Sequence, residues 1–130
     1  MAVVSNHMSS DILTASAEER LADAAKRMVE RGVGAVLVLA GERLEGILTE
    51  RDLMKAVAAG YSEDAKVGDW MTRHPETIEA DDSTGHAAAL MIHGGFRHLP
   101  VLDEGGRVAG IVSIRDLMRV ALEDSAPRGV

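Results

Sequence analysis

One stretch of sequence occurs twice in this chain, and the duplication constrains the fold more than any other feature. Residues 44–54 read LEGILTERDLM and residues 108–118 read VAGIVSIRDLM, and the two stretches begin 64 positions apart. Upstream of them, Met28 and Met91 occupy matched places 63 positions apart. A repeated unit has to be recognised before any single motif is interpreted. The chain therefore consists largely of two copies of one unit.

The composition limits what the two copies can build and bind. Apolar residues make up 46% of the 130 residues, but aromatic residues only 2%, so the core must be aliphatic and methionine-rich. No cysteine is present, and no apolar run approaches the roughly 20 residues of a membrane span. The net charge of −7 disfavours nucleic acids and anionic membranes as partners. The N-terminus does not resemble a secretory signal, so we expect a cytoplasmic protein.

The hydrophobic pattern predicts the same elements in each copy. Apolar residues from Leu21 to Val29 follow helical spacing, and Gly32 ends that helix. The apolar runs 35–39 and 44–49 predict a hairpin, and a second helix follows Thr49. With short extended segments at 12–14 and 76–78, each copy is predicted to be β-α-β-β-α. The second helices are expected to bury Leu53, Met54 and Val57 in one copy, and Leu117, Met118 and Ala121 in the other.

These elements give a predicted division of the chain into four parts. The first repeat is expected over residues 9–60 and the second over residues 76–123. A polar linker is expected at 61–75, with Trp70 and Met71 as an apolar plug, and a frayed tail at 124–130. An isolated repeat of about 60 residues would be marginally stable, so the two repeats are expected to share a core.

The duplicated stretch carries a hydroxyl, an arginine and a carboxylate where a strand leads into a helix. These residues are Thr49, Arg51 and Asp52 in the first copy, and Ser113, Arg115 and Asp116 in the second. The carboxylate can accept hydrogen bonds from two ribose hydroxyls, while the arginine and the helix N-terminus attract phosphate. Thr-x-x-Asp and Ser-x-x-Asp are also helix capping boxes, and one hydroxyl can serve either role. We therefore consider both a ligand-binding and a capping interpretation.

The two copies differ in charge beside this motif. The second copy has Arg97 and His98 where the first has Gly34 and Ala35. Two cationic side chains would favour phosphate binding in a chain that is otherwise acidic, so the second copy is predicted to be the better phosphate site. The alternatives are an ordinary solvated arginine at position 97 and a half-buried packing histidine at position 98.

In register and in duplicate, these motifs resemble the tandem cystathionine β-synthase (CBS) domain. The resemblance covers about residues 9–123 and includes the linker residues 67–75 and the run Phe96-Arg97-His98-Leu99-Pro100-Val101. It implies an α+β fold, an α/β sandwich of two β-α-β-β-α repeats packed about a pseudo-two-fold axis. It also implies clefts between the repeats that bind AMP, ADP, ATP, NAD(H) or S-adenosylmethionine, and a disc-like homodimer. The adenine contacts that it implies fall on Thr14, Val36, Thr77, Ile78 and Leu99.

The resulting functional prediction is a regulatory sensor of adenine nucleotides, with AMP favoured, that has no catalytic residues and no catalytic cofactor. A metal site is not expected, because His86 and His93 lie seven residues apart rather than at the i, i+4 spacing of helical metal ligands. Either the response passes to an unidentified protein partner, or the stability of the homodimer is itself the output. The alternative is a ligand-free dimerisation or scaffold module.

Overall fold

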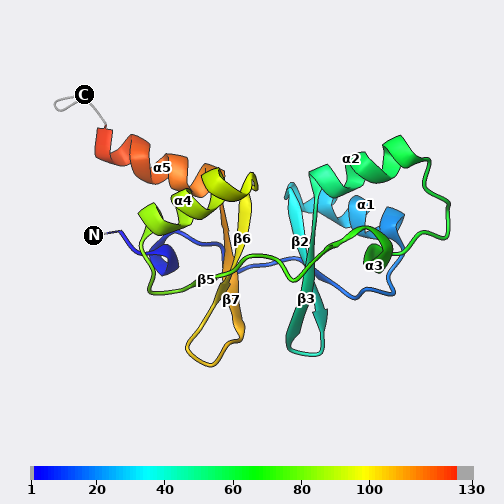
Figure 1. The fold of residues 1–130 in the computed structure, drawn as a ribbon, viewed down its shortest axis with the longest axis horizontal. Helices are drawn as coiled ribbons and strands as arrows, with labels where there is room; N and C mark the ends of the chain where they lie inside the picture. The colour runs from blue at the N-terminus through cyan, green and yellow to red at the C-terminus, as the bar shows by residue number, and fades with distance from the viewer. Residues whose placement is uncertain (1, 126–130) are drawn as a thin grey trace. The chain divides into compact units, whose positions relative to one another are not determined.

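The computed structural model describes residues 2–125, which fall into two compact units (Figure 1). The first-repeat unit is Ile12–Pro75. The second-repeat unit combines the N-terminal segment up to Asp11 with the chain from Glu76 onward. Each unit is thus built around one copy of the duplicated sequence, but the second also recruits the beginning of the chain.

The first-repeat unit contains a four-stranded sheet in the order β1-β2-β3-β4. Strand β1 pairs with β2 in parallel, whereas β2 with β3 and β3 with β4 are antiparallel. The expected β-α-β-β-α order is confirmed, and a short helix and strand follow it. The elements are β1 (Thr14–Ala15), α1 (Leu21–Arg31), β2 (Ala35–Ala40), β3 (Arg43–Thr49), α2 (Glu50–Ala59), α3 (Val67–Trp70) and β4 (Thr72–Arg73).

The second-repeat unit has the same core order with a three-stranded sheet, β5-β6-β7. Strand β5 is parallel to β6, and β6 is antiparallel to β7. Beside β7, where the first-repeat unit has β4, an isolated bridge joins Ser9 to Ile111. The elements are η1 (Val4–Asn6), β5 (Ile78–Glu79), α4 (Thr84–Gly94), β6 (His98–Leu102), β7 (Val108–Ser113) and α5 (Ile114–Ser125).

Two short segments cover corresponding places in the two units. Val67 and Met71 pack into the core of the first-repeat unit, while Val4 and Met8 pack into that of the second. Trp70 also packs against the first core, so the expected apolar plug is confirmed. The predicted linker 61–75 is accordingly more ordered than its polarity suggested, since it contains α3 and β4.

Glycine allows each of these segments to approach a strand closely. A Cβ atom on Gly46 of β3 would lie 2.7 Å from the carbonyl oxygen of Thr72, and one on Gly110 of β7 would lie 2.5 Å from that of Ser9. Ordinary Cβ contacts are longer, so the duplicated glycine serves strand packing at both places.

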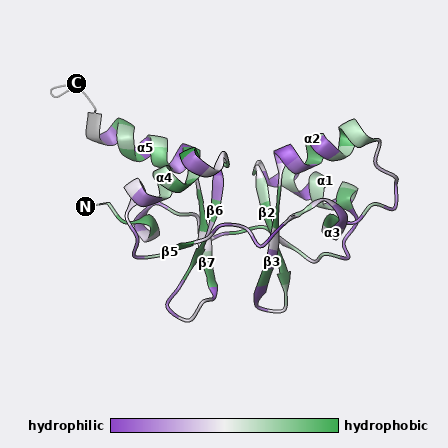
Figure 2. Ribbon diagram, in the orientation of Figure 1, coloured by the Kyte–Doolittle hydropathy of each residue, from purple (hydrophilic) through white to green (hydrophobic). Residues whose placement is uncertain are grey.

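Each unit has its own aliphatic core, as the composition required. Val36, Val38 and Leu48 are fully buried in the first, and Leu99 and Val101 in the second. Figure 2 shows hydrophilic residues at the turn that joins β2 and β3, away from these cores. None of the helices within residues 2–125 combines the length and the apolar character needed to cross a membrane.

The second helix of each repeat buries only part of its predicted face. Leu117 is buried and Leu53 packs against the first core, as predicted, whereas Ala121 is exposed. Met54 and Val57 of α2 are each 66% exposed, and Met118 of α5 is 58% exposed, so their predicted burial is wrong. The buried positions of α2 are instead Asp52 and Ala56. A helix turns by about 100° per residue, so an inward Asp52 carries Met54 to the outer face. The predicted tail also begins later, because α5 continues to Ser125; residues 126–130 lie outside the described part of the chain.

Candidate functional site

The duplicated motif forms a strand-to-helix corner in each unit. The first corner is the end of β3 and the start of α2. The amide of Thr49 donates to Asp52 Oδ2 at 2.9 Å, and the Thr49 hydroxyl donates to the same oxygen at 3.1 Å. The amide of Asp52 donates back to Thr49 Oγ1 at 3.4 Å. These reciprocal bonds are a capping box, so the capping interpretation is confirmed at this corner.

The second corner, at the end of β7 and the start of α5, has the same arrangement. The amide of Ser113 donates to Asp116 Oδ2 at 2.8 Å, and the amide of Asp116 donates to Ser113 Oγ at 3.2 Å. The first amide of α5, that of Ile114, donates to the carbonyl oxygen of Arg97 at 2.8 Å. The same bond joins Glu50 to Gly34 at the first corner, at 3.2 Å. Two amides at the start of each helix are therefore already bonded within the protein.

The carboxylates of the two corners have different surroundings. Asp52 is buried, with 5% of its surface exposed, and its Oδ1 accepts a hydrogen bond of 3.1 Å from the hydroxyl of Thr72 in β4. The side chain of Asp116 is 17% exposed, and its Oδ1 lies 3.3 Å from Nη1 of Arg119, one turn further along α5. Thr72 was not among the predicted site residues. The sequence feature that could have indicated Thr72 is a repeat: the pair Met71-Thr72 matches Met8-Ser9, which lies 63 positions earlier.

The fold brings most of the cationic candidates to the second corner. His98 begins β6 and is paired in register with Ser113, so its side chain is a cross-strand neighbour of the motif hydroxyl. Arg97 directly precedes His98 and is exposed, as is Arg115 in the first turn of α5. His98 is half-buried. At the first corner the only candidate of this kind is Arg51, which is also exposed.

The predicted apolar residues all lie on the core faces of their sheets. The side chains of Val36, Ile78 and Leu99 lie in the cores of their own units, so only their main chains could contact a ligand. Because side chains alternate along a strand, their neighbours Leu37 and Pro100 lie on the opposite faces. Both are fully buried, although neither belongs to a core cluster. Sequence reasoning missed these two because the strands are apolar on both faces.

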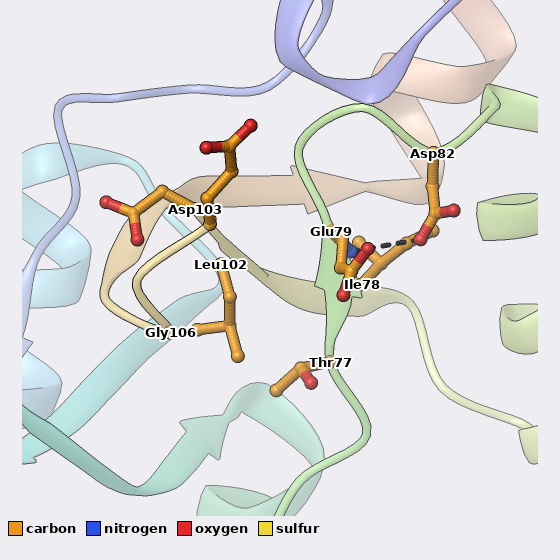
Figure 3. Close-up of a pocket in the computed structure, with 8 residues that line it drawn as sticks. Thr77, Ile78, Glu79, Asp82, Leu102, Asp103 and Gly106 are labelled. Carbon is orange, nitrogen blue, oxygen red and sulfur yellow. Dashed lines mark hydrogen bonds between the residues drawn. The ribbon is translucent and has the colours of Figure 1, made fainter.

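The remaining two candidates are threonines beside the parallel strand pairs. Thr14 begins β1 and pairs with Leu37 of β2. Thr77 directly precedes β5 and lines a pocket of about 350 Å³ in the second-repeat unit (Figure 3). The other lining residues are Ile78, Glu79, Asp82, Leu102, Asp103, Glu104 and Gly106.

This pocket is acidic and does not coincide with either corner. Glu79 and Asp82 contribute carboxylates from β5 and the turn after it, and Asp103 contributes another from the β6–β7 turn (Figure 3). Asp82 Oδ2 accepts a hydrogen bond of 3.1 Å from the amide of Glu79 and so closes the turn between β5 and α4. The clustered negative charge would repel phosphate.

An ion pair in the first-repeat unit joins the segment before α1 to the residue before α3. Lys66 Nζ lies 2.8 Å from a carboxylate oxygen of Glu18. Its hydrogen bond to Glu18 and the charge of that carboxylate raise the pKa of Lys66 above its ordinary value of 10.5. Both side chains are well exposed, so this pair supports the fold only weakly.

Comparison with known proteins identifies the duplicated unit. The model of the CBS domain matches the chain twice, over residues 4–59 and 67–123. The matched ranges begin at Val4 and Val67, the residues that start the two corresponding short segments.

Three known proteins illustrate the likeness. An uncharacterised 17.7 kDa protein of Acidianus ambivalens is 40% identical over 104 residues, which are 79% of this chain and 63% of that protein. The CBS domain pair of protein MJ0100, in complex with 5′-methylthioadenosine and S-adenosyl-L-methionine, has a TM-score of 0.88 at 26% identity, covering 95% of this chain and 98% of that one. CBSX2 in complex with AMP has a TM-score of 0.80 at 26% identity, covering 96% and 99%. The chain spans about three-fifths of the length of three curated relatives that it matches, and about a fifth to a half of several others.

Proposed function

This chain belongs to the CBS domain family, and on that premise we propose that it is a regulatory module that binds an adenine nucleotide without catalysing its conversion. The observation that carries the proposal is the second corner, where a partly exposed carboxylate and a hydroxyl lie beside the strand end that carries an arginine and a histidine. These are Asp116, Ser113, Arg97 and His98. A carboxylate at this place can accept hydrogen bonds from both hydroxyls of a ribose.

We favour AMP as the ligand, with ADP, ATP, NAD(H) and S-adenosylmethionine as alternatives. The solved relatives support an adenosine ligand, since one is a complex with AMP and another holds 5′-methylthioadenosine and S-adenosyl-L-methionine. All three of these molecules carry adenosine with its two ribose hydroxyls. Arg97, His98 and Arg115 favour a ligand with phosphate, because they bring positive charge to a chain whose net charge is −7.

In this proposal, the predicted residues beside the paired strands contact the adenine base of the ligand. The main chains of Thr14, Val36, Thr77, Ile78 and Leu99 lie in or beside the paired strands, where amides and carbonyls can recognise an adenine. Thr49, Arg51 and Asp52 repeat the motif at the first corner, where their binding role stays a prediction.

Calorimetric titration with AMP, ADP, ATP, NADH and S-adenosylmethionine tests the proposal. We expect binding of at least one of them well below millimolar, and a loss of about tenfold or more in affinity for Asp116→Asn, because hydrogen bonds to a charged acceptor are lost. Glu123→Gln, a neutralisation of an exposed acid two turns further along α5, is the matched control and should leave the affinity unchanged. The proposal is wrong if none of the five binds, or if Asp116→Asn binds as tightly as the original protein.

A second candidate function, dimerisation or scaffolding without a ligand, is favoured by the apolar side chains on the outer faces of the helices. In the first-repeat unit these are Val29, Met54 and Val57, and in the second they are Ile92, Met118 and Leu122, with exposures from 58% to 81%. Exposed apolar clusters of this kind mark interaction surfaces. A homodimer is compatible with both functions; a dimer whose unfolding temperature no nucleotide changes would favour the scaffold.

A further inference from the structure

The two carboxylates of the duplicated motif are not equally available to a ligand. We propose that Asp116 alone binds the ribose of the ligand, and that the chain therefore binds one nucleotide rather than two. Asp52 has a structural role instead, because its carboxylate is hydrogen-bonded to Thr72. This inference rests on the proposed function and specifies its stoichiometry.

Asp52 is already committed within its own unit. A carboxylate offers about four acceptor positions, and three are filled: by the amide of Thr49, by the hydroxyl of Thr49 and by the hydroxyl of Thr72. A ribose needs two, so at least one of these donors would have to give way. Asp52 is only 5% exposed, so a ribose would have to reach a buried acid as well as displace one of its donors.

Asp116 is held more loosely. Its Oδ2 accepts the capping bond from the amide of Ser113, and its Oδ1 faces the guanidinium of Arg119 at 3.3 Å. Arg119 is 66% exposed, and such a surface pair contributes little, so this arginine can turn into solvent when a ligand arrives. Two hydrogen bonds from a ribose can then be made without breaking the cap.

The difference follows from one residue pair in the corresponding short segments. Thr72 in β4 and Ser9 occupy matched places, because the pairing partners of these segments are Ile47 in β3 and Ile111 in β7. Ser9 exchanges two main-chain hydrogen bonds of 2.9 Å with Ile111. The hydroxyl of Thr72 donates to Asp52. Within the described part of the chain, the exposed hydroxyl of Ser9 makes no such hydrogen bond to Asp116.

The neighbouring charges point the same way. The corner of Asp116 has Arg97 and His98 at the start of β6, whereas the corner of Asp52 has Gly34 and Ala35 at the start of β2. A phosphate attached to the ribose would find an arginine and a histidine at one corner, and a glycine and an alanine at the matched positions of the other. Carboxylate and phosphate recognition are thus combined in one place.

Stoichiometry and paired variants test the inference with AMP as the probe. Native mass spectrometry and calorimetry of the full chain should give one AMP per chain. Asp116→Asn should weaken AMP binding by about tenfold or more, whereas Asp52→Asn should change it by less than about threefold. Without ligand, Thr72→Val should lower the unfolding temperature by about 2–8 °C through loss of the bond to Asp52, while the matched Ser9→Ala should not.

The outcomes separate this inference from the proposed function. Two AMP molecules per chain, or binding that is lost in Asp52→Asn and kept in Asp116→Asn, would overturn the inference and leave the nucleotide-binding function standing. Equal unfolding temperatures for Thr72→Val and Thr72→Ser, which keeps the hydroxyl, would also overturn it. Absence of binding by every adenine nucleotide would overturn the proposed function, and the inference with it.

Discussion

At the scale of single residues, the duplicated motif serves the fold before it serves any ligand. Its glycine lets a short segment lie against a strand, and its hydroxyl and carboxylate close a capping box. The capping pattern could be predicted from the Thr-x-x-Asp spacing because it is local in sequence. The bond from Thr72 to Asp52 could not, because it joins residues 20 positions apart and depends on how β4 pairs with β3.

Substitution of Gly46 should therefore be costly for stability. We expect Gly46→Ala to lower the free energy of unfolding by about 1–3 kcal/mol, since the added methyl group would press on the Thr72 carbonyl and the Met71 sulfur. The measurement is urea-induced unfolding followed by circular dichroism. Gly85→Ala is the control: it lies inside α4, its nearest contact would be at 3.8 Å, and it should stabilise the protein by about 0.5–1 kcal/mol. An unchanged midpoint for Gly46→Ala would show that β4 is free to move away.

At the scale of elements, α2 and α5 are oriented by their polar first turns. The capping carboxylate of α2 faces inward, so Ala56 becomes the buried position one turn later and the methionine faces out. Hydropathy alone predicts the reverse, because it ranks methionine above aspartate as a core residue. The sequence thus predicted these helices, where they begin and the inward position of Leu53 and Leu117, but not that the methionines beside them face out.

The outward apolar residues give a prediction about self-association. We expect the chain to sediment as a homodimer at micromolar concentration, and Met54→Glu together with Met118→Glu to shift it toward monomer, because charges are costly in an apolar interface. Circular dichroism should show that the helices persist, since both side chains are largely exposed. The exposed double substitution Ser5→Asp with Asn6→Asp, which also adds two negative charges but away from these helices, is the control. A monomeric original protein would refute the homodimer.

At the scale of the whole molecule, the first residues of the chain stabilise a unit that the chain completes much later. Val4 is fully buried in the core of the second-repeat unit, as Val67 is in that of the first. The sequence shows that these two segments match each other at a spacing of 63 residues, just as it shows that the helices and strands are repeated. The internal duplication and the hydrophobic pattern predicted the order of elements in both repeats. They could not predict in which unit each short segment packs, because that packing depends on contacts between residues far apart in the sequence.

Matched valine truncations test this assignment. Val4→Ala and Val67→Ala should each cost about 1–3 kcal/mol of stability, because each removes fully buried methyl groups. Hydrogen exchange should separate them: Val4→Ala should speed exchange in β6 and β7, and Val67→Ala in β2 and β3. Ser5→Ala, an exposed neighbour, should leave both patterns unchanged. Faster exchange in β2 and β3 for Val4→Ala would contradict the assignment.

The placement of Val4 and Met8 also bears on how the chain is made. During synthesis, this segment precedes its main-chain partners in the rest of the unit by many residues. Val4 and Ser5 bond to Asp82 and Ala80, and Ser9 bonds to Ile111 in β7. The first-repeat unit, by contrast, has all of its parts as soon as Pro75 has emerged. We therefore expect folding on the ribosome to proceed in two stages, with the segment around Val4 reaching its native contacts only after the first-repeat unit is complete.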